Sequence, residues 1–480
     1  MRSNTITTAI LALSLITPGL AQPTPAQVDP DVLRLTDVWL DAQQAYGRIP
    51  ALSAAIVQGD QTVWSKGYGT IDTAGKVPAT ARTIYSICSI SKLFTSVALM
   101  QQWEQDKVSL DAPLTRYLPW AKLQPDPSDS VPVTLRGALT HSAGLPRESD
   151  FPYWMGADNP FPTEAQLRGM ITRQAPLWPA SRWYQYSNLG LTLVGETVAA
   201  VSGEPFNDYV EANIIAPLGL TNTRPYLPRE LLGTQMAVGW GARDRDGKIP
   251  SLPPFDTRAI TPAAGFTSTA EDLARFAAWQ FRLLRTETPE LIRASTLREM
   301  QRVHYTSPDW KVTRGLGFRV SRRGDQTYVG HAGDCPGYHS ILDLRPATET
   351  AVVAMLTGAE SPVPMATAIF ALIDKRKGFA FKGPMGTPGP LEDYTGHYGA
   401  QPWANEAVIV PWAGGLAVAG LPSPDPAAEL LFLKPKGGDV FRAIRDDGSE
   451  ADEVRFTRSP DGKVIAMLRF SNPSPRLRPL

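Results

Sequence analysis

The sequence predicts an α/β (α+β) fold: a sheet covered by helices, together with an all-helical region, forms a large domain, and a small all-β domain follows it. Three observations support this prediction. Segments rich in β-forming residues occur at 51–57 and 62–68, and further such segments occur between residues 316 and 356. Helical spacing dominates from about residue 111 to residue 300. A Gly/Pro-rich stretch at residues 378–390 then precedes a series of short alternating runs.

The length and charge of the chain limit its class and its partners. With 480 residues it exceeds the usual size of one hydrophobic core, so two domains are expected. Its 43% hydrophobic and 20% charged residues are those of a globular protein, not of a disordered or fibrous one. The 47 basic and 47 acidic residues give a net charge of zero, so no overall positive potential attracts nucleic acid. We expect a small-molecule or peptide-like substrate, and the sequence leaves the oligomeric state open.

Residues 1–21 have the layout of a secretory signal peptide. Arg2 precedes an apolar run at residues 9–16, and the small residues Gly19 and Ala21 come before a Gln/Pro-rich segment. A membrane anchor is the alternative, but this run is far shorter than the roughly 20 residues that span a bilayer. The sequence therefore predicts an exported protein, periplasmic or secreted, with no transmembrane span.

The elements of the large domain follow from hydrophobic periodicity. Residues 51–57 and 62–68 flank a turn at Gly59 and Asp60, which predicts a β-hairpin. Leu93, Val97 and Met100 recur at helical spacing, so residues 89–103 are expected to form a buried helix. Further helices are expected at residues 189–200, 270–284 and 365–374, and further strands at 316–320, 327–330, 339–344 and 350–356.

The stretch at residues 378–390 is expected to be a linker, because it holds four glycines and three prolines in thirteen residues. The large domain then covers residues 22–377, and a β-rich C-terminal domain covers residues 391–480. Strands are expected at residues 407–410, 416–419, 430–433 and 440–444, and residues 454–456 pair with 464–470 across a turn. A lipocalin-like barrel is one candidate for this domain.

The first chemical signal is the tetrapeptide Ser89-Ile90-Ser91-Lys92 at the start of the buried helix. The i, i+3 spacing places Ser89 and Lys92 on one helix face, so hydroxyl and amine can meet. A serine alcohol is a weak nucleophile until a base accepts its proton, and a desolvated lysine has a lowered pKa that suits it for this role. The motif alone is weak, since Ser-x-x-Lys arises by chance in many proteins.

Two later elements strengthen the signal: Tyr186-Ser187-Asn188, about 100 residues downstream, and His331-Ala332-Gly333 on a predicted strand. With residues 85–95, 139–145, 186–190, 262–269 and 330–333, the chain resembles the serine β-lactamase and penicillin-binding-protein superfamily. The resemblance covers roughly residues 35–375 and is greatest to the class C-like branch, which includes esterases, D-aminopeptidases and D,D-peptidases. It implies a β-lactamase/transpeptidase-like antiparallel sheet flanked by helices, with the active site where the sheet meets the all-helical region.

Carried onto matching positions, the resemblance implies a catalytic role for four residues. Ser89 is the nucleophile that becomes acylated. Lys92 and Tyr186 share the roles of general base and general acid, in an order that the sequence leaves open. Asn188 positions Lys92 and the substrate amide.

The strand with His331, Ala332 and Gly333 is expected to align the substrate, and the backbone N–H groups of Ser89 and Asp334 to form the oxyanion hole. His331 departs from the β-lactamases themselves, which usually carry Lys-Thr-Gly there. Histidine has a reference pKa near 6.5, so we expect His331 to gain charge and favour carboxylate-bearing substrates as the pH falls toward 6. The His-x-Gly version resembles esterase, amidase and peptidase members.

The only two cysteines, Cys88 and Cys335, flank the expected site. Some class A β-lactamases carry cysteines at these two offsets joined as a disulfide, so the resemblance implies a Cys88–Cys335 bridge formed after export. Two buried free thiols are the alternative.

The leading functional hypothesis is a serine hydrolase that cleaves an ester or amide through an acyl-enzyme at Ser89. The alternatives are a β-lactamase or D,D-carboxypeptidase, or a penicillin- or peptidoglycan-binding sensor that does not turn over. The five histidines lack metal-site spacing and the chain has no G-x-S-x-G elbow, so neither a metal, nor a cofactor, nor an α/β-hydrolase fold is expected. The sequence does not identify the substrate.

Overall fold

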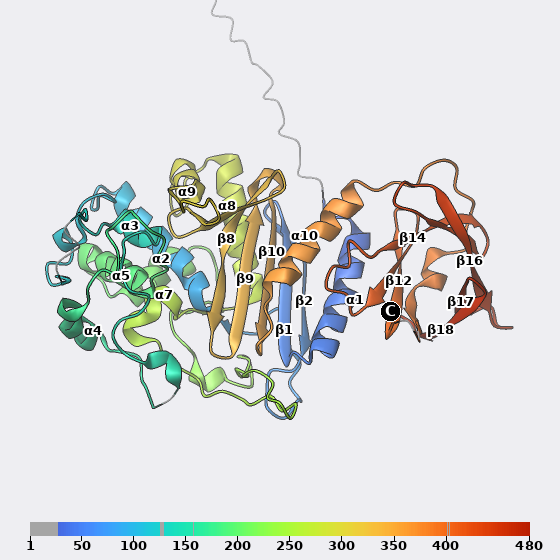
Figure 1. The fold of residues 1–480 in the computed structure, drawn as a ribbon, viewed down its shortest axis with the longest axis horizontal. Helices are drawn as coiled ribbons and strands as arrows, with labels where there is room; N and C mark the ends of the chain where they lie inside the picture. Colours follow the sequence, from blue (N-terminus) through green and yellow to red (C-terminus); the bar gives the residue numbers. More distant parts are fainter. Residues whose placement is uncertain (1–26, 125–128, 157, 401, 403) are drawn as a thin grey trace, which may run out of the picture.

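The computed structural model describes residues 27–124, 129–156, 158–400, 402 and 404–480 (Figure 1). The predicted signal peptide, residues 1–21, lies outside these residues. The large domain is built on an eight-stranded antiparallel sheet in the order β2-β1-β10-β9-β8-β7-β6-β5. Its strands are β1 (Ala51–Gln58), β2 (Gln61–Gly69), β5 (Tyr305–Thr306), β6 (Thr313–Arg314), β7 (Arg319–Arg323), β8 (Gln326–Cys335), β9 (Tyr338–Arg345) and β10 (Thr350–Thr357).

The adjacent strands β1 and β10 are buried along their whole length, because helices cover both faces of the sheet. Leu52 and Ile56 point to the face covered by α1 (Pro30–Gly47) and α10 (Val363–Lys377). Ala55 and Val57 point to the opposite face, beside α8 (Ala270–Thr286). Side chains alternate between faces along a strand, so one strand supplies two separate cores.

The helical region packs against the second core and completes the large domain. Its central element is the buried helix α2 (Ser91–Glu104), which contacts α5 (Asn188–Ser202) and α7 (Thr261–Ala264). The remaining elements are α3 (Leu135–Leu139), α4 (Glu164–Met170), α6 (Phe206–Val210), α9 (Ala294–Gln301) and a two-stranded sheet of β3 (Tyr85–Ser86) and β4 (Thr267–Ser268). Helix α2 therefore lies between the large sheet and the all-helical region.

The C-terminal domain is a closed eight-stranded antiparallel barrel whose strands follow one another in chain order. The strands are β11 (Gly396–Tyr398), β12 (Glu406–Trp412), β13 (Gly415–Leu421), β14 (Leu431–Gly437), β15 (Val440–Ile444), β16 (Glu450–Arg458), β17 (Val464–Arg469) and β18 (Asn472–Arg478). Aromatic side chains form its core, with the Tyr394 and Phe441 rings 5.1 Å apart and the Phe441 and Phe456 rings 5.5 Å apart. Closure pairs both edge strands, which leaves no open sheet edge.

Helix α1 joins the barrel to the large domain, as Figure 1 shows. Trp39 is 2% exposed and donates its indole N–H to the carbonyl of Ser423, 2.8 Å away. The ion pair between Arg34 and Glu392 spans the same junction, but both side chains are exposed, so it contributes little. Apolar burial around Trp39 is therefore the main stabilising contribution at this junction.

The fold class predicted from the sequence is confirmed, and the differences concern individual elements. Helix α1 and strands β11 and β18 were not predicted from the sequence. Strand β7 begins at Arg319, whereas residues 316–320 were expected to be extended. Gly317 there has φ +81°, and a Cβ on it would lie 1.9 Å from Ser96 Oγ of α2. This close packing against α2 holds the segment outside the strand.

Within the described ranges, none of the helices has both the length and the apolar character needed to cross a bilayer.

Replacing Trp39 with Ala is expected to lower the free energy of unfolding by about 3–5 kcal/mol, because it leaves a cavity at the junction of α1 and the barrel. Chemical denaturation measures this loss. Trp39→Phe is the matched control and should lose less, since it keeps an aromatic ring and gives up mainly one hydrogen bond. Unchanged stability in Trp39→Ala would show that the junction does not depend on this side chain.

Candidate active site

Ser89 lies in a 3-10 turn (Cys88–Ile90) that leads directly into α2. The side chain of Ser91 fixes this turn: its hydroxyl donates to the carbonyl of Cys88 at 2.6 Å and accepts from the N–H of Phe266 at 3.0 Å. Cys88 has φ +50°, in the left-handed region that non-glycine residues rarely adopt. The polypeptide is thus sharply bent just before Ser89.

The side chains of Ser89, Lys92, Tyr186 and Asn188 form one connected group. Lys92 Nζ lies 3.0 Å from Ser89 Oγ, 2.7 Å from Asn188 Oδ1 and 2.7 Å from the carbonyl oxygen of Ala263. The Tyr186 hydroxyl donates to Ser89 Oγ at 2.8 Å. Two elements of the sequence that lie about 100 residues apart therefore meet at one hydroxyl.

The Tyr186-Ser187-Asn188 motif is held by the start of α5. Ser187 is the N-cap of this helix and accepts the N–H of Gly190 at 2.8 Å, while its own hydroxyl donates to Pro146 at 2.6 Å. The capping serine leaves Tyr186 just before the helix and Asn188 as its first residue. The helix start therefore sets the positions of both functional side chains.

Burial lowers the pKa of the Lys92 ammonium well below its usual value, and the nearby Arg147 and Arg314 lower it further. Glu148 acts in the opposite direction. Burial raises the pKa of the Tyr186 phenol, partly offset by its hydrogen bond to Ser89. The lysine is thus shifted toward its neutral amine, while the tyrosine is held as a neutral phenol that can donate a proton.

Strand β8 passes close to the turn that carries Ser89. A Cβ on Gly333 would lie 2.2 Å from the carbonyl oxygen of Ile87, so glycine is required for this approach. Ser340 on β9 donates to the same carbonyl at 3.0 Å. Asp334 follows Gly333, and its side chain is 83% exposed and lies 3.2 Å from His339. Its backbone thus lies beside the turn that carries Ser89, while its carboxylate faces solvent.

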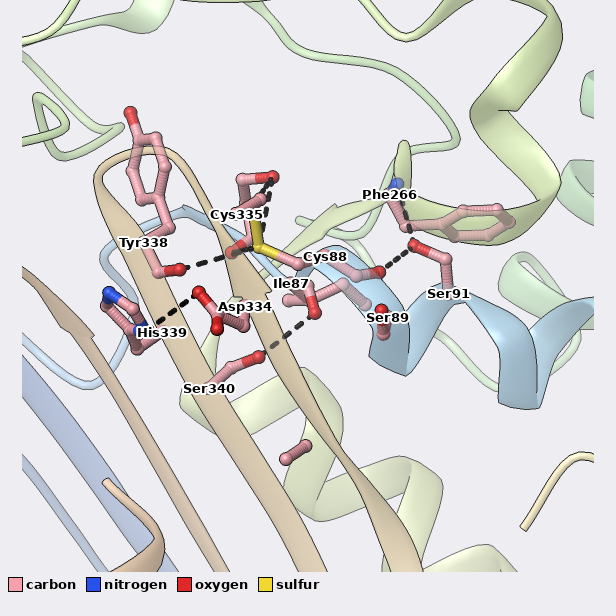
Figure 2. Close-up of a disulfide and its surroundings, with 12 residues drawn as sticks. Ile87, Cys88, Ser89, Ser91, Phe266, Asp334, Cys335, Tyr338, His339 and Ser340 are labelled. Atoms are coloured by element: carbon pink, nitrogen blue, oxygen red, sulfur yellow. Dashed lines mark hydrogen bonds and ion pairs between the residues drawn. A yellow bond between two sulfur atoms is a disulfide. The ribbon is translucent and has the colours of Figure 1, made fainter. Parts of the chain in front are cut away.

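Cys88 and Cys335 are joined as a disulfide, with their Cα atoms 5.8 Å apart. Figure 2 shows this bridge between the turn before Ser89 and the end of β8. The Cα separation lies within the usual range of about 4.4–6.8 Å. The bridge therefore links the two segments that the sequence analysis assigned to the oxyanion hole.

The expectation that His331 gains a positive charge as the pH falls toward 6 is wrong. Its side chain is buried, its Nδ1 lies 2.6 Å from the carbonyl oxygen of Ala332, and its ring centroid lies 6.2 Å from that of Tyr186. Burial, with the positive charges of Lys92 and Arg314, lowers its pKa well below the usual value. His331 therefore stays neutral as the pH falls toward 6, and it does not replace the positive charge of a lysine on this strand.

Three contacts of the site were not found from the sequence. Glu148 accepts from the amide nitrogen of Asn188 at 2.6 Å, Ala263 supplies a carbonyl oxygen to Lys92, and Arg314 lies on β6 with its guanidinium carbon 4.9 Å from the Tyr184 ring centroid. Ala263 lies in a stretch that carries the family resemblance, but it contacts Lys92 through its backbone carbonyl, and any residue type has that group. Glu148 and Arg314 lie outside the recognisable stretches.

A cavity of about 410 Å³ borders Ser89. It runs from Ser89 past Asn188 and Asp334 to Trp240. A second cavity, of about 500 Å³, shares three residues with it, Trp154, Leu252 and Pro336. Four aromatic side chains line it, Tyr153, Trp154, Phe161 and Phe255. The cavity at Ser89 thus adjoins this second cavity, which we call the aromatic pocket.

In the part of the chain that the structure describes, no group of three or more His, Cys, Asp or Glu side chains is arranged to hold a metal ion.

The sequence model of one family, described as Beta-lactamase, matches residues 37–375. The chain belongs to this family. The match covers the whole large sheet and the helical region that together carry Ser89, Lys92 and Tyr186. It ends before the barrel, so membership of the β-lactamase family describes the large domain alone.

Two curated proteins illustrate the range of the β-lactamase family. "Beta-lactamase-like protein 2" of Dictyostelium discoideum is 26% identical over 65% of this chain and only 57% of its own length. A "Putative D-alanyl-D-alanine carboxypeptidase" of Escherichia coli (strain K12) is 25% identical over 72% of this chain and 87% of its own length. These relatives support a general hydrolase activity for the chain.

One solved structure resembles nearly the whole β-lactamase-family chain. The octameric penicillin-binding protein homologue from Pyrococcus abyssi has a TM-score of 0.62 and 21% identity, over 88% of this chain and 96% of its own. This likeness concerns the fold.

Reduction of the disulfide is expected to lower both the melting temperature and the rate of acylation of Ser89. The bridge closes a loop of 247 residues, for which the chain-entropy model gives a stabilisation of about 5 kcal/mol. Thermal unfolding and ester turnover, with and without dithiothreitol, measure the two effects. Cys88→Ala/Cys335→Ala is the control and should not respond to the reductant. Two free thiols in non-reducing peptide maps would contradict the bridge.

Proposed function

We propose that the protein is a serine hydrolase that cleaves an ester or amide bond through an acyl-enzyme on Ser89. The observation that carries this proposal is the contact of one serine hydroxyl with both an amine and a phenol, at 3.0 and 2.8 Å. A nucleophile, a candidate base and a candidate acid thus lie within hydrogen-bonding distance, which is the arrangement that nucleophilic catalysis requires.

In this proposal neutral Lys92 is the base that activates Ser89. A neutral amine has two N–H donors and one lone pair. The carbonyl oxygens of Asn188 and Ala263 take the two donors, each at 2.7 Å, which leaves the lone pair for the Ser89 hydroxyl. Ser89 Oγ then attacks the substrate carbonyl carbon, its proton passes to Lys92, and the carbonyl oxygen becomes an oxyanion.

Tyr186 delivers the proton to the leaving group. Because its pKa is raised by burial, it is protonated when the tetrahedral intermediate forms. When the bond to the leaving alcohol or amine breaks, Tyr186 donates its proton and regains one from Lys92. Water then attacks the Ser89 ester with help from the same groups, which releases the acid and restores the hydroxyl.

The oxyanion is proposed to be held by the backbone N–H groups of Ser89 and Asp334. The approach of Gly333 to the turn before Ser89, and the disulfide beside it, support this assignment because both hold the end of β8 against that turn. Fixed donors of this kind are typically worth about 2.7–4 kcal/mol each in the transition state. Ala332 and Gly333 would then align the substrate backbone along β8, with neutral His331 packed beneath.

The acyl part of the substrate is assigned to the cavity that leads from Ser89 to the aromatic pocket. Ser89, Asn188 and Asp334 line this cavity, and in this proposal the leaving group lies on the side of Tyr186. The walls at Trp154 and Phe255 favour bulky apolar acyl groups.

A D,D-carboxypeptidase or β-lactamase is the second candidate, because a positive charge lies on the Tyr186 side. Arg314 lies close enough to lower the pKa of Lys92 and of His331, and it donates to the Tyr184 hydroxyl at 2.5 Å. A guanidinium there suits a leaving group that bears a carboxylate. A sensor that is acylated but does not turn over would use the same site.

We further propose that the protein is exported, as residues 1–21 suggest, and acts in the periplasm or the medium. The disulfide supports this compartment, because such bonds persist where the surroundings are oxidising. In this scheme residues 22–377 form the catalytic domain and residues 391–480 the barrel domain, joined by the linker at 378–390. No nucleic acid, metal or cofactor takes part.

Ser89→Ala is expected to abolish turnover and covalent labelling by a fluorophosphonate while leaving the fold intact, because only one small hydroxyl is lost. Lys92→Met keeps the bulk of the lysine without its amine and should slow acylation by about 10²–10⁴-fold. Intact-mass spectrometry follows labelling, and a panel of p-nitrophenyl esters, D-amino-acid amides, carboxylate-ended D,D-peptides and nitrocefin follows turnover.

Preference for the carboxylate-ended peptides or for nitrocefin would favour the second candidate over the first. A burst of acylation without turnover on the whole panel would favour the sensor. Undiminished labelling of Ser89→Ala would show that the nucleophile lies elsewhere.

A further inference from the structure

Glu148 is a carboxylate within the site that no step above uses. Its Oε1 accepts from the amide nitrogen of Asn188 at 2.6 Å, and its Oε2 accepts from the hydroxyl of Tyr153. Its side chain is 20% exposed, and Arg147 Nε lies 3.4 Å from Oε1. Both of its oxygens are therefore engaged with protein groups.

We propose that Glu148 is a positioning residue that fixes the orientation of the Asn188 amide and thereby holds Lys92 in place to activate Ser89. The proposal rests on the proposed function, because it concerns the base of that reaction. It assigns Glu148 no contact with the substrate.

The argument begins with the two ends of an amide. The Asn188 side chain has a carbonyl oxygen that accepts and a nitrogen that donates, and it could present either one to Lys92. An ionised carboxylate only accepts, so Glu148 attracts the nitrogen end. The oxygen end must then face Lys92, where it receives one amine hydrogen at 2.7 Å. Without Glu148, rotation of the amide would present donors to the amine.

Tyr153 holds the carboxylate in turn. Its ring is only 2% exposed and packs 4.7 Å from the Phe161 ring in the wall of the aromatic pocket. A buried tyrosine has few alternative rotamers, so its hydroxyl is a fixed donor for Glu148. A connected series of hydrogen bonds thus runs from the aromatic pocket through Glu148 and Asn188 to Lys92.

The charge of Glu148 gives the proposal a second consequence. The groups that face Lys92 are Ser89, Tyr186, Asn188 and the carbonyl of Ala263, with the charged Glu148, Arg147 and Arg314 and the neutral His331 and His141 farther out. Of these, Glu148 raises the pKa of Lys92, whereas Arg147 and Arg314 lower it. Removing its charge should lower that pKa further.

Three variants test the proposal through the pH dependence of acylation by a p-nitrophenyl ester. Acylation needs the neutral amine, so its rate rises with pH through the pKa of Lys92. Glu148→Gln has no charge, so the acidic limb of its pH–rate curve should move to lower pH. Its side-chain oxygen can still accept from Asn188, so it should lose less rate than Glu148→Ala. Glu148→Ala loses the orienting contact and should acylate about 10²-fold more slowly. Glu211→Gln, which removes an exposed charge on the helical region, is the matched control and should match the wild type.

An unmoved acidic limb in Glu148→Gln would overturn the proposal. The proposal would also be overturned if both Glu148 variants lost the same rate and the same melting temperature. Glu148 would then have only a structural role. Glu148→Gln keeps the test valid if Glu148→Ala does not fold. Failure of the proposed function would look different: the wild type itself would not be labelled at Ser89.

Discussion

The site depends on one buried amine. Lys92 is fully buried, and an ammonium ion in such a place would lose most of its hydration. The structure meets this cost with two carbonyl oxygens and one hydroxyl, contributed by α5, α7 and the turn before α2. In the proposed reaction the two carbonyl oxygens take the two N–H groups of the neutral amine, and its lone pair is left for Ser89. The contacts that make burial of the lysine tolerable thus also hold its nitrogen 3.0 Å from Ser89 Oγ.

The sheet contributes to the site through the close approach of β8 to the nucleophile turn. Gly333 permits this approach, Ser340 on the neighbouring strand donates to Ile87, and the disulfide spans the same gap. Because β8 and β9 belong to a sheet that is buried on both faces, the strand cannot shift without disturbing two cores. The packing of the large domain thus restrains the site directly. The barrel packs against α1 and α10, on the far side of the sheet from Ser89.

Much of this arrangement could be predicted from the sequence, because it depends on residue types at fixed spacing. Ser89 and Lys92 lie one helical turn apart, and the buried strands β1 and β10 are short runs rich in apolar and β-branched residues. Glu148 could not be found, since a lone glutamate after a loop is usually a solvated charge. His331 was misjudged for a related reason: its reference pKa ignores burial and the positive charges of Lys92 and Arg314. Strand β11 has only three residues and strand β18 carries two prolines, so neither has a β-type pattern, and barrel closure, a tertiary effect, pairs them.

The protonation state of Lys92 is the most direct test of this account. In protein labelled with ¹³C at lysine Cε, the Lys92 resonance, assigned with Lys92→Met, reports the charge of the amine as the pH changes. The account predicts a midpoint well below the ordinary lysine value of about 10.4, with the neutral amine present under assay conditions. A midpoint at the ordinary value would contradict it, because Lys92 would then be an ammonium ion that cannot accept the proton of Ser89.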